Sequence, residues 1–286
     1  MTPFALGLVL ASAVIHASWN LVTKQTRSDT AFLWLAYVVG AIAYAPLAAA
    51  VVVIARPQLP PLVLLFVVVS AGLQVLYFGA LTAGYRAGDF SLVYPVARAT
   101  GPLLATAGAI VLFGERPSVV ALVGAVAILA GALVLTGDPR ALRSRGADRA
   151  LGFAVATGVV IALYTLWDKT AVSGLLVPPL LYDWATVTLQ ALVVAPRALR
   201  DRPRLREVWR TQRRAVVGVG IASRLSYILV LTALAVSPVA YVAPAREIGI
   251  LLGAVLGARF LAEGHLVRRS LGATAMVAGV VALAVG

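Results

Sequence analysis

The chain has 286 residues, of which 61% are hydrophobic and only 12% are charged, and its mean hydropathy is +0.96. This composition excludes a soluble globular protein, because one packed core needs no such excess of apolar residues, and it predicts an integral membrane protein. The formal net charge is +13, but the basic residues lie between apolar runs rather than on one amphipathic surface, so we expect no nucleic-acid partner.

Ten apolar runs of about 20 residues follow one another along the chain. They lack the alternation that is typical of strands, and a helix satisfies its own backbone hydrogen bonds in lipid, so we predict an all-α protein with ten transmembrane helices. In chain order, the predicted spans are 3–22, 31–55, 61–84, 90–113, 118–136, 150–172, 178–196, 215–236, 239–261 and 268–285. Two longer connections, 137–149 and 197–214, are rich in arginine and are predicted to be loops.

The basic residues are distributed unevenly between the two sides of this predicted bundle. Most of the 24 Lys and Arg residues follow the odd-numbered runs, whereas only Arg56, Arg116 and Lys169 are assigned to the other side. By the positive-inside rule, the first side is cytoplasmic and both termini face outward. We therefore expect a multi-pass protein of the cytoplasmic (inner) membrane, whose Arg-rich connections orient the chain and contact membrane lipids.

An internal repeat relates the two halves of the chain. At an offset of 148 residues, Trp19 matches Trp167, Arg98 matches Arg246 and Gly124 matches Gly272. At an offset of 150, Gln74 matches Arg224 and Tyr77 matches Tyr227. We predict a first five-helix repeat over 1–137, a cytoplasmic Arg-rich linker over 138–149 and a second five-helix repeat over 150–286. Because five is odd, the second repeat is inverted, an arrangement that suits alternating access to a central site.

Several short motifs, in this order and spacing, resemble the ten-helix, EamA-type branch of the drug/metabolite transporter superfamily. They are "HASWN" at 16–20, "GDFSLVYPVARATGPLL" at 88–104, the "GE" of "LFGERPS" at 112–118 and "LYTLWDK" at 163–169. The second copy departs from the pattern, with "REIGI" at 246–250 and "FLAEGH" at 260–265. The resemblance implies movement of a small organic solute across the cytoplasmic membrane, but it does not choose a cargo.

Two arginines at bilayer depth are the strongest candidates for a functional site. Arg98 lies about 5 Å from the midplane of its predicted helix at 1.5 Å per residue, and Arg246 has the same depth by the repeat. An arginine there is unfavourable by about 2.5–3.5 kcal/mol on insertion scales, so both should face protein or a wet cavity. Either they bind or gate a cargo, or they join helices through helix-end carbonyls, Glu247, Asp168 or Asp183. We expect a substrate site that includes Arg98, Arg246, Arg224, Gln74, Tyr77, Tyr227, Trp19, Trp167 and Tyr94.

The predicted charge balance of this site favours one class of cargo. Three guanidiniums face one central carboxylate, Glu247, while Asp168 and Asp183 are predicted nearer the outer edge. Guanidiniums match carboxylate and phosphate geometry, so we expect an anionic or zwitterionic cargo such as an amino acid or a phosphorylated compound. Glu247 and Asp168 serve either as counter-charges or as carriers of a coupled proton, and the first reading is favoured.

Other classes of function have less support from the sequence. An enzyme is not expected, because no phosphate-binding loop, GxSxG elbow or HExxH motif is present. A membrane enzyme without a recognisable motif and an exporter of lipophilic or cationic drugs remain the alternatives. With no cysteine and two isolated histidines, neither a metal nor another cofactor is expected. A homodimer is left open.

Overall fold

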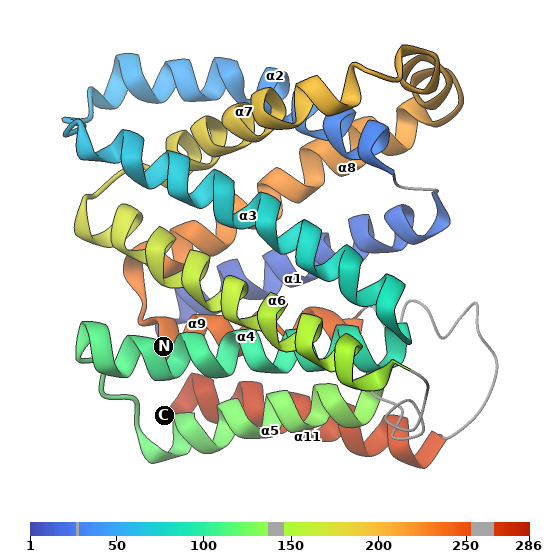
Figure 1. Ribbon diagram of the computed structural model, residues 1–286. Helices are drawn as coiled ribbons and strands as arrows, with labels where there is room; N and C mark the ends of the chain where they lie inside the picture. Colours follow the sequence, from blue (N-terminus) through green and yellow to red (C-terminus); the bar gives the residue numbers. More distant parts are fainter. Residues whose placement is uncertain (27–28, 137–145, 253–265) are drawn as a thin grey trace.

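The computed structural model describes residues 1–26, 29–136, 146–252 and 266–286 of the 286-residue chain, and these residues are helical almost throughout (Figure 1). The helices are α1 (Pro3–Gln25), α2 (Thr30–Ala55), α3 (Leu62–Ala87), α4 (Phe90–Phe113), α5 (Val119–Thr136), α6 (Ala147–Lys169), the π-helical turn η2 (Thr170–Gly174), α7 (Pro179–Ala198), α8 (Arg202–Val236), α9 (Val239–Ala245) and α11 (Leu266–Val285).

Within this described part, seven helices are long and apolar enough to cross a membrane, namely α1 to α6 and α8, and α11 holds a shorter apolar stretch, Ser270–Val285. Their outer faces are strongly apolar, with Ile54 82% exposed and Val111 80% exposed. Such exposure of large apolar side chains is typical of a surface that contacts lipid. The prediction of an all-α, multi-pass membrane protein is therefore confirmed, whereas the count of ten spans remains a prediction.

One predicted boundary was wrong, and one predicted span contains a break. Residues 202–214 form the first turns of α8 rather than a loop, because Asp201 accepts the N–H of Arg204 at the helix start and Leu205 and Val208 are buried against α2. The predicted span 239–261 is interrupted, since α9 ends at Ala245 and Arg246 and Glu247 form a turn before the helix resumes at 248–252. Pro244 precedes the break and has no N–H to donate to the preceding turn. Residues 253–261 of this span lie outside the described residues.

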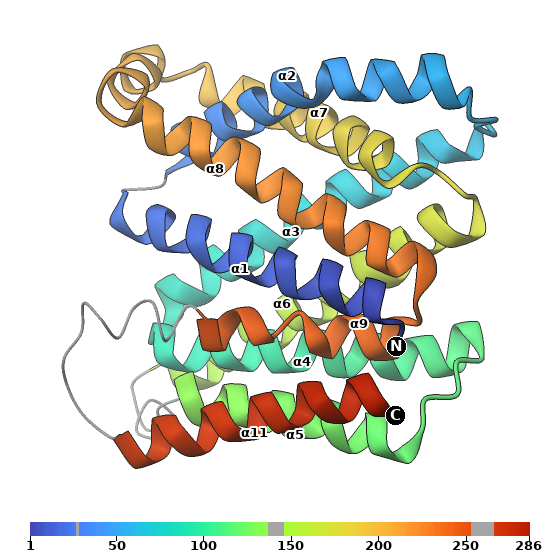
Figure 2. The same cartoon turned by 180° about the vertical axis from the view of Figure 1, so that it is seen from behind.

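The helices pack in matched pairs. Helix α1 packs along α8 and α3 packs along α6, while α2 packs on α7, α4 on α9 and α5 on α11. The pair α5 and α11 lies side by side at one edge of the bundle in both views, and both termini lie at the same end of the molecule (Figures 1 and 2). Suppose that α6, α7, α8, α9 and α11 correspond to α1, α2, α3, α4 and α5. The pair of α1 with α8 then corresponds to the pair of α6 with α3, and each of the other three pairs joins two corresponding helices.

The contact between α5 and α11 depends on glycines that the repeat relates. A Cβ added at Gly124 would lie 2.7 Å from the carbonyl oxygen of Gly279, and one added at Gly131 would lie 2.7 Å from that of Gly272. The two helices therefore run antiparallel with their backbones in contact, as small residues allow in membrane helices.

We expect Gly131→Ala to destabilise the protein by about 1–3 kcal/mol, because the methyl group must displace backbone atoms of α11. Gly7→Ala in α1 is the matched control, since a Cβ there meets nothing within 4 Å and alanine favours a helix over glycine. The measurement is the free energy of unfolding in mild detergent. Equal effects of the two substitutions would contradict a close backbone contact at Gly131.

The carboxylate of Glu115 joins the end of α4, in the first half of the chain, to the start of α9, in the second half. Glu115 follows α4, and its two carboxylate oxygens accept the N–H groups of Val239 at 2.7 Å and Ala240 at 2.9 Å. These N–H groups begin α9 and have no acceptor within the helix. The "GE" motif thus caps, from the first half of the chain, the helix that leads to Arg246.

Candidate functional site

The three central arginines come from three different elements. Arg98 lies in α4 one turn after Pro95, Arg224 lies in the middle of α8, and Arg246 occupies the turn that follows α9. Each side chain is partly buried. They face the interior of the bundle, as predicted, but their partners differ from those expected from the sequence.

Arg98 forms an ion pair with Glu247, joining α4 to the break after α9. The Nε atom of Arg98 and the Oε2 atom of Glu247 are 2.8 Å apart, and the two side chains are 11% and 4% exposed. The Nε–H bond does not point at this oxygen, so neither atom makes an aligned hydrogen bond. The contact between Arg98 and Glu247 is therefore a buried charge pair.

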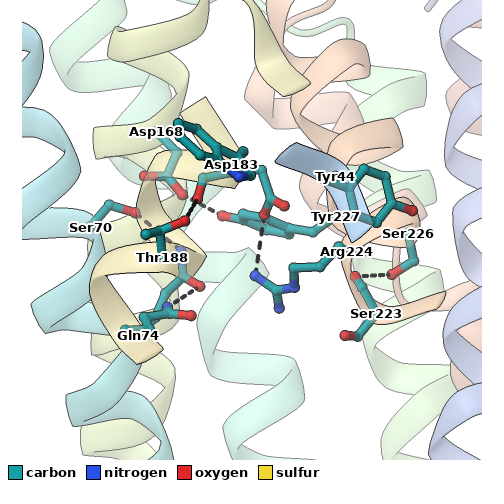
Figure 3. Close-up of polar contacts among 12 residues, drawn as sticks. Tyr44, Ser70, Gln74, Asp168, Asp183, Thr188, Ser223, Arg224, Ser226 and Tyr227 are labelled. Carbon is teal, nitrogen blue, oxygen red and sulfur yellow. Dashed lines mark hydrogen bonds and ion pairs between the residues drawn. The ribbon is translucent and has the colours of Figure 1, made fainter. Parts of the chain in front are cut away.

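Arg224 is also paired, through Asp183, one of the acidic residues that the sequence analysis named as a possible partner of an arginine. Its Nη1 atom lies 3.2 Å from the Oδ1 atom of Asp183 in α7, whose side chain is only 1% exposed. Figure 3 shows the Asp183 carboxylate facing the guanidinium of Arg224 within the bundle. The second oxygen of Asp183 and the Nε atom of Arg224 are buried without a hydrogen-bond partner. Polar atoms of this kind are available to a bound molecule.

Asp168, near the end of α6, is joined to the same cluster by hydrogen bonds. Its Oδ1 atom accepts the hydroxyl of Tyr182 at 2.8 Å, and its Oδ2 atom accepts a very short hydrogen bond from the hydroxyl of Tyr227. The Tyr227 hydroxyl points toward Asp168 in Figure 3. Because Asp183 pairs with Arg224 and Asp168 is joined through Tyr227, three carboxylates rather than one accompany the three guanidiniums, and the predicted excess of guanidiniums is not found among the described residues.

Arg246 differs from the other two arginines. Its guanidinium carbon lies 5.9 Å from the centre of the Tyr227 ring, a cation–π distance. Among the residues that the structure describes, no carboxylate lies within ion-pair distance of Arg246. In the described part of the chain, Arg246 is thus a central cation that contacts an aromatic ring instead of pairing with a carboxylate.

Aromatic side chains connect these charged groups. The rings of Tyr77 and Tyr164 are 6.2 Å apart and those of Tyr164 and Tyr227 are 6.3 Å apart, both edge to face. Tyr94 lies one turn before Arg98 in α4 and is partly buried. The structure therefore brings Tyr77 and Tyr227 together, as the repeat predicts, through a third tyrosine that the sequence analysis missed.

The remaining predicted residues serve to join helices. Trp167 stacks on Phe66 at 4.3 Å and donates to the Phe66 carbonyl, whereas Trp19 packs in the separate apolar cluster between α2 and α8. Gln74 donates to Ser70 at 3.1 Å and accepts from Gln190 at 2.9 Å. Trp19 also lies edge to face with His16 at 4.7 Å between ring centres, and its indole Nε1 is buried without a hydrogen-bond partner among the described residues. Trp167 and Gln74, by contrast, have partners of their own.

Some of the missed residues carried a signal in the sequence. Tyr164 matches His16 at the offset of 148, so a polar side chain recurs at that place in both halves. Asp183, Thr186 and Gln190 recur at helical spacing along one face of α7 and are each about 1% exposed. Tyr182 lies beside this face, and its role depends on Asp168, which no local pattern reveals.

A helical bundle with an apolar outer surface and ion pairs buried between its helices is typical of a polytopic membrane protein. Residues 3–137 match the model of the EamA-like transporter family. The match confirms the predicted resemblance to the drug/metabolite transporter superfamily and supports a transporter rather than an enzyme.

Comparison with solved structures agrees with this fold. A crystal structure described only as that of a protein superposes with a TM-score of 0.75 over 97% of each chain, at 19% sequence identity. At this identity the likeness concerns the fold alone. No curated protein matches the chain by sequence.

Proposed function

We propose that this chain is a secondary transporter that moves a small anionic or zwitterionic metabolite across the cytoplasmic membrane by alternating access. In this proposal, residues 1–137 and 150–286 are five-helix repeats of opposite orientation, joined by the Arg-rich linker 138–149. The exchange of helix pairs supports the arrangement, because α1 on α8 mirrors α6 on α3. Exchanging the conformations of two such halves would open the same centre to each side in turn.

The orientation in the membrane follows from charge. The first turns of α8 carry Arg202, Arg204, Arg206, Arg210, Arg213 and Arg214, and they lie at the opposite end of the bundle from the two termini (Figure 1). By the positive-inside rule, the arginines are cytoplasmic and the termini lie outside.

The main support for an anionic or zwitterionic cargo is that Arg246 has no carboxylate partner in the described part of the chain. Arg98 and Arg224 have carboxylate partners, whereas the guanidinium of Arg246 rests on the Tyr227 ring. A guanidinium offers five donors in a planar fork that fits a carboxylate or phosphate. We therefore assign Arg246 to the anionic group of the cargo, with Tyr227, Tyr164 and Tyr77 as aromatic walls.

Two further features make a zwitterion a good fit. Glu247 is adjacent to Arg246, and its carboxylate is held by one ion pair, between Oε2 and the Nε atom of Arg98. An ammonium group could approach the same carboxylate while the cargo's carboxylate lies on Arg246. The helix is interrupted at the same place by the turn at Arg246 and Glu247, and transporters use such discontinuous helices for binding.

The test is the thermal stability of the purified protein in mild detergent with amino acids, dicarboxylates, phosphorylated metabolites, nucleotide sugars and lipophilic cations. We expect stabilisation by members of the anionic and zwitterionic classes only, of about 2.7 kcal/mol at 100 times the dissociation constant. Arg246→Gln should weaken binding of the stabilising compound about 10- to 100-fold, since a hydrogen bond to a charged group contributes about 1.5–3 kcal/mol.

Arg206→Gln is the matched control, because Arg206 is exposed at the start of α8 and should leave binding unchanged. Stabilisation by lipophilic cations alone would overturn the cargo class and favour a drug exporter. Release of a chemically altered product from any compound in the panel would favour a membrane enzyme instead.

A further inference from the structure

The Asp168 carboxylate is the one buried acid of the central cluster that lacks a cationic partner in the described part of the chain. It is 0% exposed, and no Lys, Arg or His side chain of the described residues lies within ion-pair distance of it. Asp183 and Glu247, by contrast, are paired with Arg224 and Arg98. The neighbouring Lys169 donates instead to the carbonyls of Leu234 at 2.6 Å and Ser237 at 3.1 Å.

In the described part of the chain, the polar groups around Asp168 come from the neighbouring helices. Tyr182 comes from α7 and Tyr227 from α8, and both donate to the carboxylate. Ser70 of α3 is within hydrogen-bond reach, and the charges of Arg246 and Asp183 act on Asp168 from farther away. A buried carboxylate held by neutral hydroxyls alone is far less stable when ionised than one paired with a cation, so it readily takes up a proton.

From this geometry we infer that Asp168 is a proton-binding site of the transporter, and that Tyr227 couples its protonation to cargo bound at Arg246. The ionised carboxylate accepts the hydroxyl hydrogen of Tyr227. When a proton binds to Oδ2, the carboxyl group becomes the donor and the Tyr227 oxygen becomes the acceptor, so the tyrosine must turn its hydroxyl hydrogen elsewhere. One proton is taken from solvent and no covalent bond other than O–H is formed or broken.

The coupling follows from charge. Arg246 lies against the ring of Tyr227, so Asp168 and Arg246 share this side chain as a neighbour. Protonation removes a negative charge that otherwise attracts the guanidinium, and it leaves Arg246 free to balance an anionic cargo. Proton and anion therefore bind cooperatively, and the affinity for the anion rises as the pH falls. This coupling, unlike the proton binding itself, rests on the proposed function.

The experiment is an infrared pH titration of the purified protein in detergent without cargo, from acidic to neutral pH. A protonated carboxylic acid gives a C=O stretching band that an ionised one lacks. We expect one such band to titrate and to be lost in Asp168→Asn. It should persist in Asp183→Asn and Glu247→Gln, which remove the two ion-paired acids of the same cluster.

Three results would overturn the proposal: the absence of a titrating band, its persistence in Asp168→Asn, or its loss in Asp183→Asn or Glu247→Gln instead. If Asp168→Asn does not fold, Tyr227→Phe decides, since removing the hydroxyl should shift the frequency of the band and an unshifted band contradicts the assignment. Because no cargo is present, failure here leaves the proposed transport function untouched, and a negative cargo panel leaves the proton site untouched.

The coupling between protonation of Asp168 and cargo binding is tested by the pH dependence of cargo affinity. In the thermal assay, the apparent affinity for the same amino acid or dicarboxylate should rise by up to tenfold per pH unit on acidification in the wild-type protein, as expected for one coupled proton. In Asp168→Asn the affinity should be independent of pH and close to that of the wild type at acidic pH. Equal pH dependence in the two proteins would overturn the coupling while leaving the proton site in place.

Discussion

Glu247→Gln is expected to lower the free energy of unfolding by about 3–5 kcal/mol, one of the largest effects of a single substitution in this chain. The substitution removes the charge that balances Arg98 but leaves the guanidinium in place, with only 11% of its side chain exposed. Removing one partner of a buried ion pair is strongly destabilising for this reason. The measurement is denaturant unfolding of the variant in mild-detergent micelles.

The double variant Arg98→Gln with Glu247→Gln should recover most of this loss, because two neutral side chains no longer leave a buried charge unbalanced. Glu207→Gln is the matched control. Glu207 forms an ion pair of similar length, 2.8 Å, with Arg204, but its side chain is 59% exposed, so its loss should change stability by less than about 1 kcal/mol. Equal effects of Glu207→Gln and Glu247→Gln would show that burial does not determine the contribution of the Arg98 pair.

The helices were largely predictable from the sequence because hydrophobicity in a membrane protein is a local property. The run 90–113 coincides with α4, and the run 31–55 differs from α2 by one residue. The start of α8 was missed because arginine-rich turns read as a loop, although Leu205 and Val208 recur on one face and pack against α2. A buried stripe of two residues is too short to distinguish a helix from a loop by composition.

The central residues were predicted better than their partners. Depth and the repeat identified Arg98, Arg224 and Arg246, because an intramembrane arginine is rare and stands out in a single chain. Which carboxylate each one meets depends on the rotation and register of neighbouring helices, and no short-range pattern contains this information. Asp183 illustrates the point, since counting from the start of its run placed it near the edge, whereas packing of α7 places it against Arg224.

Glu115→Ala is expected to destabilise the protein by about 3 kcal/mol. The two N–H groups of Val239 and Ala240 are buried at the start of α9 and lose their only charged acceptor. A hydrogen bond to a charged group contributes about 1.5–3 kcal/mol, and the partial exposure of Glu115 places each of the two near the lower limit. The measurement is again the free energy of unfolding in mild detergent.

Glu115→Gln provides the graded comparison, because its amide keeps one acceptor oxygen and should retain part of the stability. The contact joins the end of α4, which carries Arg98, to the start of α9, which leads to Arg246. If Glu115→Ala and the wild type unfold at the same denaturant concentration, this junction does not hold the two arginines in place. If the variant is destabilised as expected, the position of the "GE" segment has a physical reason that is independent of any cargo: the first N–H groups of a helix have no acceptor within that helix, and Glu115 supplies one from outside α9.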